Sequence, residues 1–205
     1  MSVKFLYFDL GMVLLNFSVE QMCRQMAEAA GITPTQVSQI IFDGDLQQRY
    51  ERGEISSREF YEEFCRASGA RPDYDRLASA ASEIFELNGS MVPIVAQLRQ
   101  AGYRLGILSN TCEHHWQHCF RRFRLLGETF SVFALSYELK AMKPDAAIFL
   151  AAARLAGVQP GEIFFCDDIA GHVAGARAAG IDAVQYTTTP ELVAELRKRG
   201  IRFNY

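Results

Sequence analysis

Two apolar stretches of this chain end on acidic side chains. Asp9 directly follows the run Phe5–Phe8, and Asp167 and Asp168 follow the run 163–166. Such runs are typical of buried strands in a parallel sheet, and ligands bind at the carboxyl ends of such strands. Carboxylate oxygens there can hold a divalent cation or attack an electrophile. The spacing therefore predicts a metal or nucleophile site built from two distant parts of the chain.

Two further polar stretches follow the same pattern. Residues Ser109–Thr111 come after the predicted strand 103–108, and Lys143 stands before Pro144 in a loop further on. Each has an ordinary structural interpretation, because hydroxyl and amide side chains cap helices and most lysines are exposed. Their order along the chain nevertheless favours one shared site. They would add hydrogen-bond donors and a positive charge to the carboxylates.

The elements that must position these side chains alternate along the chain. Apolar strand patterns are separated by amphipathic helical patterns, as in repeated β-α-β units. Because such connections are right-handed crossovers, the strands are expected to be parallel. The sequence predicts an α/β fold with a doubly wound, Rossmann-like parallel sheet. The expected strands are residues 3–8, 103–108, 131–136, 163–166 and 183–186, and the expected helices are residues 91–101, 113–123, 145–156, 170–179 and 191–199.

A long insert separates the first predicted strand from the second. Residues 17–87 show helical patterns only. Within them, Ser18 with Gln21 and Ser56 with Glu59 have the spacing of helix-start signatures. Helices without strands would form an inserted all-α cap instead of joining the sheet. We predict a core of residues 1–16 and 89–205 and a helical cap of residues 17–88.

Composition narrows the class of protein and its partners. The chain has 205 residues and a formal charge of −3 at pH 7, which argues against nucleic acid or an anionic membrane surface as the main partner. No apolar run reaches the roughly 18 residues of a membrane span. Five cysteines, an odd number without regular spacing, suit reduced thiols. We expect a cytoplasmic protein without membrane or nucleic-acid partners, and the sequence leaves its oligomeric state open.

Four motifs together resemble those of the haloacid dehalogenase superfamily. They are FDLGMV at residues 8–13, ILSNT at residues 107–111, the pair Lys143-Pro144, and FFCDD at residues 164–168. The resemblance covers the whole chain, and the helical insert stands where that superfamily has its first type of cap. It implies that the residue at position 9 is a nucleophile that becomes transiently phosphorylated.

The same resemblance implies roles for the other site residues. Lys143 would neutralise the charge of nucleophile and phosphate as a catalytic residue, together with Ser109. Ser109, Asn110 and Lys143 would bind the substrate. Mg²⁺ would be held by Asp9, by the main-chain carbonyl of Gly11, by Asp168, and by Asp167 either directly or through water. The site residues implied by the resemblance are therefore Asp9, Gly11, Ser109, Asn110, Lys143, Asp167 and Asp168.

The expected function follows from this set. The FDLG start and the stretch ERGEIS at residues 51–56 also look like those of bacterial glucose-1-phosphate phosphatases within the superfamily. We expect a Mg²⁺-dependent phosphohydrolase of small phosphorylated metabolites, such as a sugar phosphate, working through an aspartyl-phosphate intermediate. The partner would be a small-molecule phosphate ester.

Gly11 departs from the superfamily pattern, since most of its phosphatases have a second Asp there that protonates the leaving alcohol. General acid–base help contributes about 10²–10⁴ in rate, so its loss would slow hydrolysis without abolishing it. Two alternatives stay open: a dehalogenase-like hydrolase that does not act on phosphate, and a weakened binding or regulatory protein. Dehalogenases usually have serines in place of Asp167 and Asp168, and C–P cleavage would need a cap lysine, which residues 15–88 lack.

Other residues are candidates for the missing acid only because of their location. His172 follows Asp167 by five residues, but a helix-capping or surface role is the simpler interpretation. Acidic residues of the cap are candidates on the same weak ground, and neither they nor His172 belong to the predicted site. These cap residues are Asp43, Asp45, Glu51 and Glu54.

Overall fold

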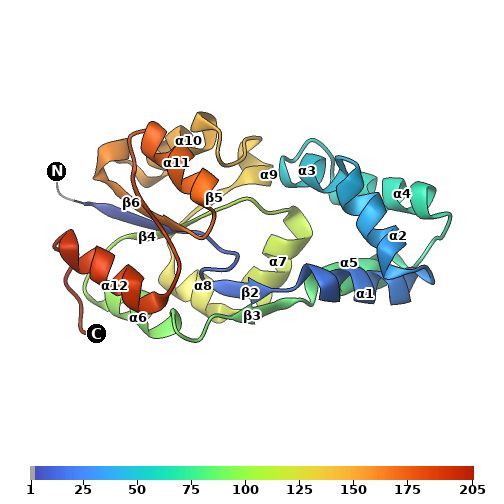
Figure 1. Ribbon diagram of the computed structural model, residues 1–205, viewed down its shortest axis with the longest axis horizontal. Coiled ribbons are helices and arrows are strands. Elements are labelled where there is room, and N and C mark those ends of the chain that lie inside the picture. The colour runs from blue at the N-terminus through green and yellow to red at the C-terminus, as the bar shows by residue number, and fades with distance from the viewer. Residues whose placement is uncertain (1–2) are drawn as a thin grey trace.

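A sheet of five parallel strands forms the centre of the core. The computed structural model describes residues 3–205, and the strand order is β5-β4-β1-β6-β7. Figure 1 shows the sheet in one half of an elongated molecule, with helices above and below it. The predicted doubly wound parallel fold is confirmed. The strands are β1 (Phe5–Phe8), β4 (Leu105–Ser109), β5 (Val132–Leu135), β6 (Ile163–Asp167) and β7 (Asp182–Gln185).

The central strands are buried throughout because helices cover both faces of the sheet. Every residue of β1, β4 and β6 is buried. Side chains of a strand alternate between the two faces: Leu6 and Phe8 pack into one hydrophobic cluster, and Phe5 and Tyr7 into the other. The sheet therefore separates two apolar layers, and the unbroken apolar runs of the sequence follow from this double burial.

Helices of the core lie on both sides of the sheet. In Figure 1, α10 and α11 lie on one face, and α6 and α12 lie on the other. The short helices α8 and α9 were not predicted, because each is only four to six residues long. The core helices are α6 (Val92–Gln100), α7 (Glu113–Arg122), α8 (Arg124–Thr129), α9 (Ser136–Leu139), α10 (Ala146–Ala156), α11 (Ala170–Ala178) and α12 (Thr189–Lys198), with a 3₁₀ turn at Pro160–Glu162.

The inserted cap is made of helices, as predicted. The Ser18 side chain accepts a hydrogen bond from the Gln21 amide, and Ser56 and Glu59 cap each other's backbone amides. Figure 1 shows these helices as a separate layer at the far end of the molecule from the chain termini. The cap helices are α1 (Val19–Ala30), α2 (Pro34–Ser38), α3 (Leu46–Glu51), α4 (Ser57–Ser68) and α5 (Tyr74–Ser82), with a π-helical turn at Gln39–Asp43.

The expectation of helices alone over residues 17–87 is wrong at both ends of the insert. Two short strands, β2 (Leu15–Phe17) and β3 (Phe85–Leu87), pair antiparallel where the chain leaves and re-enters the core. The rings of Phe17 and Phe85 lie 5.6 Å apart across this ribbon. Pairing satisfies the backbone groups of both crossing segments. Strands of three residues are too short to show an alternating pattern in the sequence.

Two further expectations concern the organisation of the chain. The division into a core of residues 1–16 and 89–205 and a cap of residues 17–88 stays a prediction. Contacts join the two parts, since α5 packs against α7 and α3 against α9. Within residues 3–205, none of the helices has the length and apolar character needed to cross a membrane.

Candidate active site

The predicted polar residues converge at the carboxyl ends of the strands. The chain runs outward from β1 to β4 and β5, then returns to β1's other side for β6 and β7. The change of direction falls between β1 and β6, and ligands of such sheets bind at this point. Asp9 directly follows β1, and Asp167 is the last residue of β6. The fold therefore brings together two carboxylates that are 158 residues apart, as the residue numbers show.

Asp9 is a buried carboxylate that is fixed by the backbone. Its main-chain amide donates to the Cys166 carbonyl at 2.9 Å, and its Oδ1 accepts from the Leu10 amide at 2.7 Å. Burial raises the pKa of Asp9 to about 6, against the lowering effect of the Lys143 charge, and the Asp167 charge adds to the rise. The side chain is 9% exposed, so a small part of it remains accessible.

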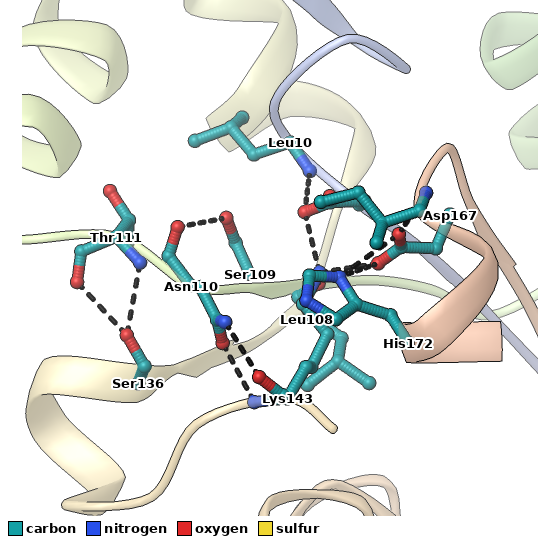
Figure 2. Close-up of polar contacts among 11 residues, drawn as sticks. Leu10, Leu108, Ser109, Asn110, Thr111, Ser136, Lys143, Asp167 and His172 are labelled. Carbon is teal, nitrogen blue, oxygen red and sulfur yellow. Dashed lines mark hydrogen bonds and ion pairs between the residues drawn. The ribbon is translucent and has the colours of Figure 1, made fainter. Parts of the chain in front are cut away.

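Lys143 joins the two carboxylates. Its Nζ lies 2.9 Å from Asp9 Oδ1 and 2.6 Å from Asp167 Oδ2, and it also donates to the Leu108 carbonyl at 3.2 Å. Figure 2 shows this ammonium at the centre of the polar contacts. Burial would lower the pKa of Lys143, but the two carboxylates outweigh it and hold the pKa above its ordinary value. The lysine is therefore charged, although its side chain is fully buried.

The Asn110 side chain positions Lys143 by pairing with its main chain. Its side-chain amide donates to the Lys143 carbonyl at 3.0 Å and accepts from the Lys143 main-chain amide at 2.8 Å, as Figure 2 shows. Both polar ends of this side chain are therefore occupied in positioning Lys143. Ser109 is buried at the end of β4, and its hydroxyl donates to the Asn110 carbonyl at 3.3 Å. The expected binding of a phosphoryl group by Ser109, Asn110 and Lys143 stays a prediction.

Asp167 is the most enclosed member of the site. Its Oδ1 accepts from the Ile169 amide at 2.8 Å, and His172 Nδ1 lies 3.1 Å from Oδ1 and 3.2 Å from Oδ2. Burial would raise the pKa of Asp167, but the hydrogen bond from His172 and the charge of Lys143 outweigh it and hold the pKa below its ordinary value. Asp167 is therefore the more strongly ionised of the two carboxylates.

His172 belongs to the site, although the sequence favoured a surface or capping role. Its side chain is 13% exposed and faces the Asp167 carboxylate. The signal was its position in the first turn of α11, directly after β6, where a side chain can turn back toward the strand end. A histidine there is more often exposed, so the position alone did not decide the assignment.

The donor set suits a divalent cation. Among residues 3–205, Asp9, Asp167 and His172 each offer one ligand atom, and these atoms lie within 4.8 Å of one another. Mg²⁺ takes one or two carboxylates together with water and substrate oxygens, so the two carboxylates fit it. Asp168 stands outside this group, and burial together with the Asp167 charge raises its pKa. The predicted ligand set of Asp9, Gly11, Asp167 and Asp168 stays a prediction.

A cavity of about 110 Å³ lies against the site, between the core and the cap. Its core wall includes Gly11, Ser109 and Asn110, and its cap wall includes Gln47 and Glu51. One water needs about 10–15 Å³ of such space, so the cavity has room for a small organic group. A small molecule in this cavity would therefore contact both the loop that follows β4 and helix α3.

Fold and site together define a capped, doubly wound α/β enzyme with an acidic site balanced by one lysine. Residues 7–180 match the family of haloacid dehalogenase-like hydrolases. The chain therefore belongs to this family, and the predicted resemblance to the superfamily is confirmed.

Individual relatives agree with this assignment. A Bacteroides thetaiotaomicron enzyme of the family, solved in complex with magnesium and inorganic phosphate, is 26% identical with a TM-score of 0.78, covering 91% of this chain and 95% of that one. A predicted hydrolase of the family from Porphyromonas gingivalis is 25% identical with a TM-score of 0.82, covering 96% and 99% of the two chains.

One curated relative is named as a phosphatase with a defined substrate. The glyceraldehyde 3-phosphate phosphatase of Methanopyrus kandleri is 32% identical over 99 residues, which are 46% of this chain and 41% of that protein. The match thus spans less than half the length of this relative.

Proposed function

We propose that this hydrolase is a Mg²⁺-dependent phosphatase of small phosphorylated metabolites, with sugar phosphates as the leading substrate class. The observation that carries the proposal is the sharing of one buried ammonium by two buried carboxylates, Asp9 and Asp167. Two carboxylates beside one ammonium give the site a net negative charge, which a divalent cation can neutralise. The relatives named as a phosphatase and solved with magnesium and phosphate support the same chemistry.

Asp9 is the nucleophile in this proposal. It stands directly after the end of β1, just before Leu10 and Gly11, which line the cavity together with Ser109. Its carboxylate would attack phosphorus to form an aspartyl-phosphate. Lys143 stays charged and offsets the repulsion between carboxylate and phosphate, while Ser109 offers a neutral donor. Water then hydrolyses the phosphorylated carboxylate, so one difficult step becomes two easier ones. The residues that would hold Mg²⁺ are Asp9, Asp168, the main-chain carbonyl of Gly11, and Asp167 directly or through water, and the ion would supply positive charge and orient the phosphate.

A dehalogenase-like reaction fits the site less well. A neutral haloacid carbon does not require an extra cation beside the nucleophile, whereas a phosphate dianion does. The site has an acidic excess, with Asp167 held ionised by His172 and Lys143, which favours the phosphate reaction. A binding protein without turnover would keep the same charges, and only a rate measurement separates it from the enzyme. The cytoplasmic location is likewise a prediction.

The proposal is tested with a panel of phosphorylated metabolites and p-nitrophenyl phosphate, run with Mg²⁺ and with EDTA, beside 2-haloacids. Wild type should release phosphate only with the cation, and Asp9→Asn should reduce the rate to background. Asp45→Asn is the matched control, because Asp45 is an exposed cap residue and its loss should leave the rate unchanged. Halide release, or full activity of Asp9→Asn, would overturn the proposal.

A further inference from the structure

The position beside the nucleophile offers no proton donor in this chain. Gly11 has no side chain, and the space that one would use is occupied. A Cβ built on Gly11 would lie 2.9 Å from Cε1 of Phe17. An apolar ring therefore stands where a donor close to Asp9 would be expected. Alcohols are poor leaving groups unless they are protonated, so a donor must come from another wall of the cavity.

Two titratable side chains outside the core motifs line that cavity, Glu51 and His115. His115 Nε2 lies 3.1 Å from the Ala81 carbonyl, which can only accept, so this nitrogen must carry the ring's proton. Burial lowers the pKa of His115 to about 4. The neutral ring therefore donates its one N–H to the Ala81 carbonyl and has no proton for a leaving group. Glu51 is the remaining candidate.

Glu51 is held at the boundary between the cap and the phosphoryl-binding loop. It is the last residue of α3, and its main-chain carbonyl accepts from the Ser136 hydroxyl at 2.6 Å. The same hydroxyl accepts from the Thr111 amide at 2.9 Å. Two residues further along, the Gly53 carbonyl accepts from Lys140. These contacts fix the end of α3 against α9 and, through the Ser136 hydroxyl, link it to the loop that follows β4.

The carboxyl group of Glu51 is oriented and kept partly dry. Gln47, one turn earlier on α3, donates from Nε2 to Glu51 Oε1 at 2.8 Å. Burial raises the pKa of Glu51, against the lowering effects of the Gln47 hydrogen bond and the Lys143 charge. A carboxyl group of this kind retains its proton closer to neutral pH than an exposed glutamate does. After it has lost its proton, the Glu51 carboxylate can accept one again.

We propose that Glu51 is the general acid and base of this site, replacing a donor at position 11. As Asp9 attacks phosphorus and the bond to the leaving oxygen breaks, the Glu51 proton moves to that oxygen and an alcohol departs. The Glu51 carboxylate then takes a proton from the water that attacks the aspartyl-phosphate. Phosphate leaves, and both Asp9 and the protonated Glu51 are restored. This inference rests on the proposed phosphatase function.

A leaving-group series tests the assignment. The kcat/KM of wild type and of Glu51→Gln is measured for aryl and alkyl phosphates whose leaving groups differ in pKa. An acidic phenol needs no proton, so Glu51→Gln should act on its phosphate nearly as fast as wild type. An alkyl phosphate should lose about 10²–10⁴ in kcat/KM. The plot of log kcat/KM against leaving-group pKa should therefore be shallow for wild type and steep for Glu51→Gln.

Glu54→Gln is the matched control, because Glu54 follows α3, is exposed, and pairs with Arg52. It should keep the wild-type slope. A uniform loss across the series in Glu51→Gln would show that Glu51 only binds substrate, and an unchanged slope would also overturn the assignment. If wild type hydrolyses the esters and Asp9→Asn does not, such a result refutes the role of Glu51 alone. If wild type hydrolyses none of them, the proposed function fails and this inference fails with it.

Discussion

Replacing Lys143 with methionine should destabilise the protein strongly when no divalent cation is present. The ammonium lies 2.9 Å from Asp9 and 2.6 Å from Asp167. Methionine has a similar length and fills most of the same space, so the change removes mainly the charge. Two carboxylates then face each other across a buried site without a counter-charge.

The size of the effect follows from these distances. At an effective dielectric constant of about 20, opposite charges about 3 Å apart attract by about 5 kcal/mol. The variant no longer has to bury the lysine charge, and this gain offsets part of the free energy lost with the two attractions. Removing one partner of a buried ion pair costs about 3–5 kcal/mol in practice. For a chain of this size, each kcal/mol lowers Tm by about 2–4 °C, so we expect a drop of about 6–20 °C.

The measurement is thermal unfolding at pH 7.5 in EDTA, followed by circular dichroism or calorimetry. Lys198→Met is the control, because it removes the same charge from a side chain that is 68% exposed and pairs with Glu195. Exposed pairs contribute little to stability, so this variant should melt like wild type. If Lys143→Met also melts within about 2 °C of wild type, the three charges do not hold the site together as the distances indicate.

The penalty for Lys143→Met should also depend on pH. Burial raises the pKa of Asp9 to about 6 even with the lysine present, and removing Lys143 takes away the charge that opposes this rise. A carboxyl group with a raised folded-state pKa stabilises the protein at low pH and loses that contribution as pH rises. The difference between variant and wild type should therefore shrink from pH 7.5 to pH 5. A constant difference would place the loss in packing instead of charge.

Two further predictions concern the cation and the contact between cap and core. Because the pKa of Asp9 is about 6, protons compete with Mg²⁺ for its carboxylate at acidic pH. The affinity for Mg²⁺, measured by calorimetry, should therefore rise roughly tenfold per pH unit below 6 and level off above 7. An affinity that does not change from pH 5 to 7 would contradict this. Gly53→Ala should lower the free energy of unfolding in urea more than Gly31→Ala does. Both glycines have a left-handed backbone, with φ of +67° and +70°, but a Cβ would lie 2.1 Å from the Tyr137 carbonyl at Gly53 and more than 4 Å from any neighbour at Gly31. Gly31→Ala should lose about 1–2 kcal/mol from backbone strain alone, and equal losses would mean that the cap is not packed against Tyr137.

The sequence predicted the central residues of the site because they stand at the ends of strongly patterned strands. Asp9 and Asp167 follow unbroken apolar runs, and the alternation of strands and helices implies a parallel sheet whose carboxyl ends share one edge. Lys143 lies in the loop region after β5, so the topology brings it to the same edge. The fold class follows from the same patterns, since long periodic segments are the part of a sequence that most directly specifies secondary structure.

The contacts that position these residues could not be predicted, because they depend on long-range geometry. Asn110 pairs through its side chain with the main chain of Lys143, 33 residues away. From the sequence alone, a polar residue at position 110 is more simply interpreted as a helix cap than as a partner of Lys143. The β2–β3 ribbon was missed for a related reason, since its two strands are 70 residues apart and three residues each. Pairing of such short segments is visible only once the ends of the insert are placed together.

A proton donor on the cap changes what the cap does. A donor at position 11 would stay beside Asp9 whatever the position of the cap, because both residues follow β1. Glu51 lines the cavity from the end of α3, and Ser136 and Lys140 hold that end by hydrogen bonds. A leaving group too large to let α3 seat would then go unprotonated even if its phosphate bound correctly. If Glu51 is the proton donor, selection among phosphate esters would act on the chemical step as well as on binding.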